Sequence, residues 1–185
     1  MRHTLFHTLS LFLFPTMHPL KSTAEILASK VLGESVDERW IAWALEMLEA
    51  EFETEHLLIL AGENPPFNQF YLTELTNKVL KELGLEYSNK DKVLDQYISY
   101  LIDGVLAGQV NMLKVLRMLK DMHVEHGYQC DSKFQDFYFL YYAKDELEDF
   151  DHQFYWDGAN RENIDEIILR YFVAWKTQNE HLSSI

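Results

Sequence analysis

Five glycines constrain the fold of this chain more than any other feature of its sequence. Each one follows a stretch in which apolar residues recur with the spacing of one helix face: Gly33, Gly62, Gly84, Gly108 and Gly127. Glycine ends a helix readily because it adopts the left-handed conformation of a C-cap without steric cost. With only 7 Gly and 4 Pro in 185 residues, the stretches between the stops are long enough for helices. The pattern predicts an all-α fold, a bundle of seven to eight short helices.

Polar residues suited to capping a helix N-terminus precede most of these stretches. Two pairs match the capping box, in which a hydroxyl and a carboxylate each accept a backbone hydrogen bond: Ser22 with Glu25, and Ser35 with Glu38. Asparagine side chains are expected to cap four later helices, at Asn68, Asn89 (or Ser88), Asn111 and Asn160. Starts and stops together predict helices over about residues 23–32, 36–52, 54–61, 68–83, 89–108, 111–127, 132–150 and 160–179.

The second predicted helix has a broad apolar side. Its inward face is predicted from four residues spaced i, i+3, i+4 and i+7, namely Ile41, Ala44, Leu45 and Leu48. Three larger side chains widen that side: Trp40, Trp43 and Met47.

Residues 134–142 are the least certain part of the helical assignment, because their aromatic side chains favour strands. No second segment of the chain resembles a strand that could pair with them, and a lone strand is unstable. The run Ala-Lys-Asp-Glu-Leu-Glu that follows favours a helix. We therefore expect a helix over about residues 132–150, aromatic on nearly all sides and central to the fold, with a strand as the alternative.

The chain shows no Pro-rich or Ser-rich linker, so residues 22–180 are expected to form a single helical domain, followed by a frayed tail at 181–185. Residues 1–21 are expected to be a poorly ordered or non-native extension that a translation start at Met17 would shorten. A lone cysteine, Cys130, excludes an internal disulfide and fits a cytoplasmic protein. Secretion is the alternative if residues 1–16 act as a signal, because residues 5–14 are mostly apolar.

The chain is strongly acidic. Sixteen Lys and Arg against 30 Asp and Glu give a formal charge of 16 − 30 = −14. This charge repels nucleic acid and anionic lipid, so neither a nucleic acid nor a membrane is expected as a partner. The same field attracts a basic protein.

The acidic residues gather in two clusters. One comprises Glu49, Glu51, Glu53 and Glu55, and the other comprises Asp145, Glu146, Glu148, Asp149 and Asp151. If both segments are helical, the pairs 49/53, 51/55 and 145/149 place like charges one turn apart, and each pair costs a few tenths of a kcal/mol. The clusters are therefore either solvated faces or docking surfaces for a basic partner.

The run Phe154-Tyr155-Trp156-Asp157 lies close to the second cluster and adds aromatic side chains of the kind that anchor interfaces. Alternatively, these rings close the end of the core. The candidate partner-binding residues are Asp145, Glu146, Glu148, Asp149, Asp151, Tyr155, Trp156, Glu49 and Glu53.

A metal site is the main alternative to a docking surface. Glu53 and His56 have the Glu-x-x-His spacing that places two ligands on one helix face, as in di-iron bundles. Asp149 with His152 repeats the spacing with a shorter acid, and His123 and His126 are also three residues apart. A di-iron site needs further inward glutamates, which the apolar helix faces lack, so no cofactor is expected.

Other catalytic signatures are missing from the sequence, which contains neither a Gly-x-Ser-x-Gly elbow nor a glycine-rich phosphate loop. Cys130 follows His123 and His126, but its acidic surroundings disfavour a thiolate. Lys114, Arg117 and Lys120 form a basic stripe, which is expected to pair with an acidic helix of the same chain or of a second copy.

The stretch Arg39-Trp-Ile-Ala-Trp-Ala-Leu-Glu-Met-Leu-Glu-Ala50, followed by Leu57-Leu-Ile-Leu-Ala-Gly62 and Pro66-Phe-Asn68, resembles a loose group of small uncharacterised bacterial all-helical proteins. The resemblance covers about residues 36–108 and includes the stop at Leu83-Gly84-Leu85. It implies a bacterial source, an intracellular all-α fold and a place among proteins found beside toxin or defence genes. It transfers no functional residue.

These observations favour a non-enzymatic interaction protein. A narrower form is an immunity or inhibitor protein for a basic toxin, because a small acidic domain can mimic phosphate toward a basic active site. The alternatives are a metal-binding helical enzyme that uses Glu53 and His56, and a helical subunit with a structural role.

Overall fold

The computed structural model describes residues 20–126 and 134–179 of the chain. These residues form eight helices and no strand, which confirms the predicted all-α fold. In chain order the helices are α1 (Thr23–Leu32), α2 (Glu38–Glu49), α3 (Glu55–Ala61), α4 (Gln69–Glu82), α5 (Lys90–Leu106), α6 (Met112–His126), α7 (Gln135–Asp149) and α8 (Ile164–Gln178). The predictions for the two chain ends, for the stop at Gly127 and for Cys130 lie outside the described residues.

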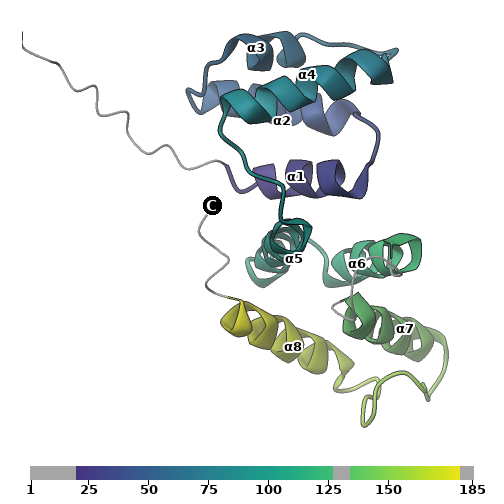
Figure 1. Ribbon diagram of the computed structural model, residues 1–185. Coiled ribbons are helices and arrows are strands. Elements are labelled where there is room, and N and C mark those ends of the chain that lie inside the picture. The colour runs from purple at the N-terminus through teal and green to yellow at the C-terminus, as the bar shows by residue number, and fades with distance from the viewer. Residues whose placement is uncertain (1–19, 127–133, 180–185) are drawn as a thin grey trace, which may run out of the picture.

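Helix α5 lies in the middle of the molecule, with α1–α4 on one side and α6–α8 on the other (Figure 1). It packs against α1, α6 and α8. Ten of its 17 residues are buried, including an unbroken run from Val93 to Ser99, so the helix is covered around most of its circumference. The central helix is therefore α5, and the expectation that the aromatic helix would be central is wrong.

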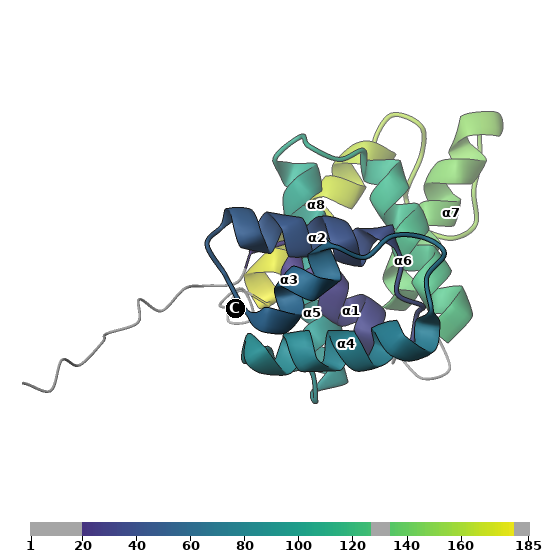
Figure 2. The same ribbon diagram turned by 90° about the horizontal axis from the view of Figure 1, so that it is seen from above.

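The aromatic segment is a helix, α7, as expected, and it lies at an outer edge of the molecule (Figure 2). Its buried side chains Phe137, Leu140 and Tyr141 repeat with the period of a helix, and this spacing outweighs the strand preference of the aromatic residues. It packs against α6 and α8. Phe137 contacts α8, with its ring centroid 5.3–6.1 Å from those of three α8 rings, Tyr171, Phe172 and Trp175.

One hydrophobic core contains buried side chains from all eight helices. Its largest fully buried members are Trp40, Phe134, Phe137 and Phe172. At the surface, a single guanidinium joins α1 to α2, because Arg39 lies 3.5 Å from Glu25, 2.9 Å from Glu34 and 2.8 Å from Asp37. Among the described helices, none is both long enough and apolar enough to cross a membrane.

Three predicted asparagine caps are confirmed. Each side-chain oxygen accepts a hydrogen bond from the backbone N–H three residues later, at 3.0–3.2 Å: Asn68 from Tyr71, Asn89 from Lys92 and Asn111 from Lys114. These bonds satisfy N–H groups that the first helical turn leaves without a partner.

The two predicted capping boxes are wrong. The Ser22 hydroxyl donates to Glu46 on α2 instead of accepting from its own helix. Helix α2 begins at Glu38, because Asp37 caps it by accepting from the Arg39 N–H, so Ser35 caps nothing. The fourth asparagine, Asn160, makes the predicted kind of bond, because its side chain accepts from the N–H groups of Glu162 and Asn163, but these bonds lie in a turn that leads into α8, and the helix itself begins at Ile164.

The described glycine stops behave as predicted with one exception. Gly33, Gly84 and Gly108 have positive φ values of 73°, 65° and 70°, so each adopts the left-handed conformation expected after a helix. Gly62 also ends its helix, but with a φ of −88°, which any residue can adopt.

The inward face of α2 differs from the predicted one. Trp40, Trp43, Ala44 and Met47 are buried, whereas Leu45, predicted to face inward, is 49% exposed. The helix is rotated because Trp43 packs toward α1, where its indole N–H donates to the Thr23 hydroxyl at 3.0 Å.

This rotation predicts opposite outcomes for two neighbouring substitutions. Met47→Ala should lower the free energy of unfolding by about 2–5 kcal/mol, because it opens a cavity in the core. Leu45→Ala should change it by less than about 0.5 kcal/mol, because that side chain is half in solvent. Urea unfolding followed by circular dichroism measures the free energy of unfolding of both variants. An equal decrease in the two variants would contradict the burial of Met47 and the exposure of Leu45.

Candidate functional site

The two acidic clusters lie at opposite sides of the molecule, since the α2–α3 connection and the C-terminal end of α7 are far apart in both views (Figures 1 and 2). The candidate residues Glu49 and Glu53 therefore share no surface with Asp145, Glu146, Glu148, Asp149 and Asp151. The structure does not combine the predicted residues into one site, and each cluster has to be judged by itself.

The first cluster is not helical throughout, so the predicted like-charge pairs 49/53 and 51/55 do not form on a helix. Helix α2 ends at Glu49, and Glu51 adopts a left-handed backbone conformation with a φ of 64°. Glu53 precedes α3, which begins at Glu55. All four carboxylates are exposed, so this cluster consists of charges spread along a surface connection.

The predicted metal ligands Glu53 and His56 are not joined by a third ligand. His56 contacts Glu82 of α4 through its ring Nδ1, and its backbone N–H donates to the same carboxylate at 3.1 Å. Nowhere in residues 20–126 and 134–179 do three or more His, Cys, Asp or Glu side chains gather as a metal site would require. In the structure His56 instead connects α3 to α4.

The second cluster is divided between covered and exposed carboxylates. Asp145 and Glu146 are half-buried, and the Tyr141 hydroxyl donates to Asp145 at 3.3 Å. Glu148, Asp149 and Asp151 are exposed. The charges available to a partner are therefore those at the end of α7 and just beyond it.

Tyr155 and Trp156 are half-buried and make intramolecular contacts. The Tyr155 ring stacks on Tyr142 at 5.2 Å between centroids, and Trp156 meets the Tyr171 ring edge to face at 5.8 Å. These contacts match the alternative interpretation, in which the two rings close the end of the core. The exposed aromatic side chains here are Phe150 and Phe154, which are 57% and 86% exposed.

His152 lies between these two phenylalanines. Its ring centroid is 6.3 Å from that of Phe150 and 5.4 Å from that of Phe154. These three aromatic rings lie in the same short segment as the exposed carboxylates of Glu148, Asp149 and Asp151. We refer to Glu148, Asp149, Phe150, Asp151, His152 and Phe154 as the acidic aromatic corner.

One amide side chain holds the turn that carries Phe154. The Gln153 Oε1 accepts from the N–H groups of Tyr155 at 2.7 Å and Trp156 at 2.8 Å. Its Nε2 donates to the carbonyls of Trp156 at 2.6 Å and Ala159 at 3.1 Å. A side chain that satisfies four backbone groups fixes the course of the turn, so Phe154 is presented from a defined backbone.

Arg161 fixes the end of α7 against the same turn. Its guanidinium Nε donates to the carbonyls of Leu147 at 2.8 Å and Phe150 at 3.2 Å, and Nη1 lies 3.2 Å from Asp151. Helix C-termini carry partial negative charge, and the last turn of α7 contains acidic residues and no basic one. Arg161 supplies the missing positive charge from outside the helix.

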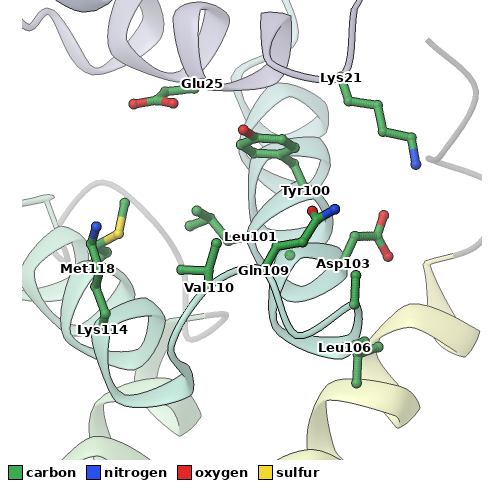
Figure 3. A pocket seen from close by; sticks show the side chains of 12 residues that line it. Lys21, Glu25, Tyr100, Leu101, Asp103, Leu106, Gln109, Val110, Lys114 and Met118 are labelled. Carbon is green, nitrogen blue, oxygen red and sulfur yellow. The ribbon is translucent and has the colours of Figure 1, made fainter.

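The predicted basic stripe of α6 is partly used within the chain. The charged groups of Arg117 and Lys120 lie 5.9 Å and 5.2 Å from the centroid of the Tyr141 ring on α7. The Tyr141 hydroxyl, followed by the charge of Asp145 among other groups, raises the pKa of Arg117. Lys114 is exposed and lies at one side of a cavity between α1, α5 and α6 (Figure 3).

Comparison with protein-family models, with curated proteins and with solved structures finds no match to this chain. The resemblance to bacterial all-helical proteins therefore stays a prediction.

The pairing of His56 with Glu82 predicts a pH-dependent contribution to stability. The His56 hydrogen bond lowers the pKa of Glu82, and although burial opposes this shift, bonds from Thr54 and the His56 backbone add to it. A carboxyl whose pKa is lowered by folding contributes stability above its ordinary pKa of 4.5, and this contribution is lost as the pH falls through the lowered value. Glu82→Gln should therefore destabilise the protein at neutral pH, and its deficit relative to the wild type should shrink as the pH falls below 4.5.

Urea unfolding of both proteins at several pH values measures this difference. Glu74→Gln, on the exposed face of the same helix, is the matched control and should change the free energy of unfolding by less than about 0.5 kcal/mol. A Glu82→Gln deficit that is the same at neutral and acid pH would show that the contact with His56 contributes nothing through ionisation.

Proposed function

We propose that this chain is a non-enzymatic protein-binding domain that recognises a basic partner through the acidic aromatic corner. The observation that carries the proposal is the exposure of Phe150 and Phe154 amid exposed carboxylates at one end of α7. Aromatic residues, phenylalanine among them, are enriched in protein interfaces relative to the rest of the surface, whereas a solvated acidic face does not need them. Acidic residues alone would not distinguish this corner from the α2–α3 connection.

The charges of the corner are unfavourable for the isolated fold. Glu148 and Asp149 occupy the last turn of α7, where a negative charge opposes the helix dipole at a cost of about 0.3–1 kcal/mol each. Asp145 and Asp149 are also one turn apart on the same helix, so their charges repel each other. A basic partner that neutralises these carboxylates relieves both repulsions when it binds.

The exposed rings suit a partner that carries arginine or lysine. A guanidinium or ammonium group can lie over the face of Phe150 or Phe154 while it pairs with a neighbouring carboxylate. The negative field of the whole chain, with its net charge of −14, increases the rate of encounter with such a partner. An immunity or inhibitor protein for a basic toxin is the narrower form of this proposal, and charge complementarity is what supports it.

Reversing the charges of the corner should weaken binding to a basic apolar probe. We expect Glu148→Lys combined with Asp149→Lys to weaken the affinity for a short peptide of alternating arginine and leucine by about tenfold or more at low salt. Isothermal titration calorimetry measures the affinity, and a peptide with glutamate in place of arginine should not bind. Phe154→Ala should weaken binding further without changing the net charge.

The matched control is Glu49→Lys combined with Glu53→Lys, which changes the net charge equally at the opposite side of the molecule. This double variant should retain nearly the wild-type affinity. If both double variants weaken the peptide equally, only bulk charge attracts it and the corner is not a binding site. A second control removes the two charges without reversing them. The variant that combines Glu148→Gln with Asp149→Asn should be at least as stable as the wild type, so any loss of peptide binding in it would not be caused by unfolding.

A further inference from the structure

A small cavity of about 200 Å³ lies between α1, the start of α2, α5 and α6. It shares Glu25 and Met118 with the larger cavity shown in Figure 3, and it shares no lining residue with the acidic aromatic corner. A water molecule takes up about 30 Å³ in the liquid, so the small cavity has room for a molecule of about six or seven non-hydrogen atoms.

Acidic side chains outnumber basic ones in the lining of this small cavity. Four carboxylates and one guanidinium give a formal charge of 1 − 4 = −3, from Glu25, Glu34, Asp121, Glu125 and Arg39. A site with this excess of negative charge favours a cationic ligand.

The ion pairs of the lining do not cancel its negative charge. Arg39 pairs with two of the lining carboxylates and with Asp37 as well, and Lys120 pairs with Asp121. Counting Asp37 and Lys120, which lie outside the lining, adds one charge of each sign. Glu125 has a further partner within the chain, and the charge of the lining is negative even when Glu125 is left out of the sum.

Two hydroxyls in the lining are buried without a hydrogen-bond partner. Tyr97 is only 6% exposed, and its hydroxyl makes no hydrogen bond within residues 20–126 and 134–179. The Ser29 hydroxyl, in the α1 wall, is also buried and unpartnered there. Because buried polar groups normally have partners, two orphaned hydroxyls in one small cavity indicate a ligand that supplies the missing bonds.

The charges around the Tyr97 hydroxyl show that it faces the ionic part of the cavity. Burial, followed by the charge of Glu25, raises the pKa of Tyr97, and Glu34 adds to this shift while Arg39 opposes it. The hydroxyl therefore stays neutral at neutral pH, and its oxygen can accept a hydrogen bond from a cationic donor.

The rest of the lining is apolar, with Ala28 and Leu32 on α1 and Met118 and Met122 on α6. Methionine side chains are flexible and adapt to the shape of an apolar group. A bare metal ion would leave this surface without a contact, and the described residues hold no group of three or more metal-ligating side chains. The lining thus fits an organic cation, with a charged end and a short apolar body.

The acidic wall is positioned by bonds within the chain. The Glu34 backbone N–H donates to the Ser29 carbonyl at 3.0 Å, just after α1 ends, and the Glu34 carboxylate lies 2.9 Å from the Arg39 guanidinium. These bonds fix the wall before any ligand binds, which lowers the cost of binding.

We infer that this cavity binds a small alkylammonium ion. Its ammonium group donates to the Glu25 carboxylate and to the Tyr97 hydroxyl, and its alkyl chain lies against Leu32, Met118 and Met122. Glu25 is the carboxylate that Arg39 holds least closely, at 3.5 Å against 2.8 Å and 2.9 Å for the other two. The inference is independent of the proposed docking surface, which lies at another part of the molecule.

Three small probes test the contributions of the charge and of the alkyl chain. Pentan-1-amine is positively charged at neutral pH, pentan-1-ol has the same chain without the charge, and methylamine has the charge without the chain. We expect pentan-1-amine to bind at one site with a Kd of about 1–5 mM, at least about fivefold tighter than the other two. Absence of saturation up to about 50 mM, or an affinity equal to that of either other probe, would overturn the inference.

Nuclear magnetic resonance of the ¹⁵N-labelled protein measures these affinities and locates the binding. The largest shift changes caused by pentan-1-amine should belong to backbone amides at residues 25–34, 97 and 118–125. Changes of similar size at both acidic clusters would show that the cation is attracted only by the net charge, and that the cavity is not its site.

Two variants remove the proposed contacts one at a time. Glu25→Gln should weaken the binding of pentan-1-amine about fivefold or more, and Tyr97→Phe should weaken it several-fold with no change of charge, because each removes an acceptor of the ammonium group. Neither should change the affinity for pentan-1-ol by as much. Glu74→Gln, an exposed residue of α4 outside the lining, removes the same charge as Glu25→Gln and is the matched control. If Glu25→Gln and Tyr97→Phe weaken the amine no more than Glu74→Gln does, the assignment of this cavity is wrong.

Discussion

The burial of α5 is the constraint on which the rest of the structure depends. Because most of its circumference must be covered, α1, α6 and α8 all pack against this one helix. Helices α2, α3 and α4 then extend the core on the α1 side, and α7 extends it on the side of α6 and α8. The second half of α5 also lines a cavity of about 670 Å³ beside α1 and α6, so the helix that holds the fold together reaches the surface there.

Local signals in the sequence predicted the elements well, because capping and termination depend on neighbouring residues. Asn68, Asn89 and Asn111 cap their helices, and Gly33 ends α1, through bonds that span only a few residues. Features that depend on contacts between helices could not be predicted from neighbouring residues. The face of α2 was predicted from spacing alone, yet it is set by the contact of Trp43 with Thr23, twenty residues earlier in the chain.

The candidate site shows the same difference between local features, which the sequence predicts, and contacts between distant residues, which it does not. The sequence shows the acidic residues of α7, but it predicts Tyr155 and Trp156 as the aromatic contacts, whereas the exposed rings are those of Phe150 and Phe154. Nothing local tells which of several adjacent aromatic residues finds a ring to pack against inside the molecule. Arg161 gave no signal either, since its importance arises only when folding brings it to the carbonyl of Leu147, fourteen residues away.

The turn held by Gln153 separates the residues that shape the corner from the residues that a partner would touch. Gln153 and Arg161 bond to backbone atoms, which every amino acid possesses, and these bonds do not depend on the side chains at positions 150 and 154. Phe150 and Phe154, in contrast, project mainly into solvent. Partner preference can therefore diverge by exchange of two outward side chains while the scaffold that displays them is inherited unchanged.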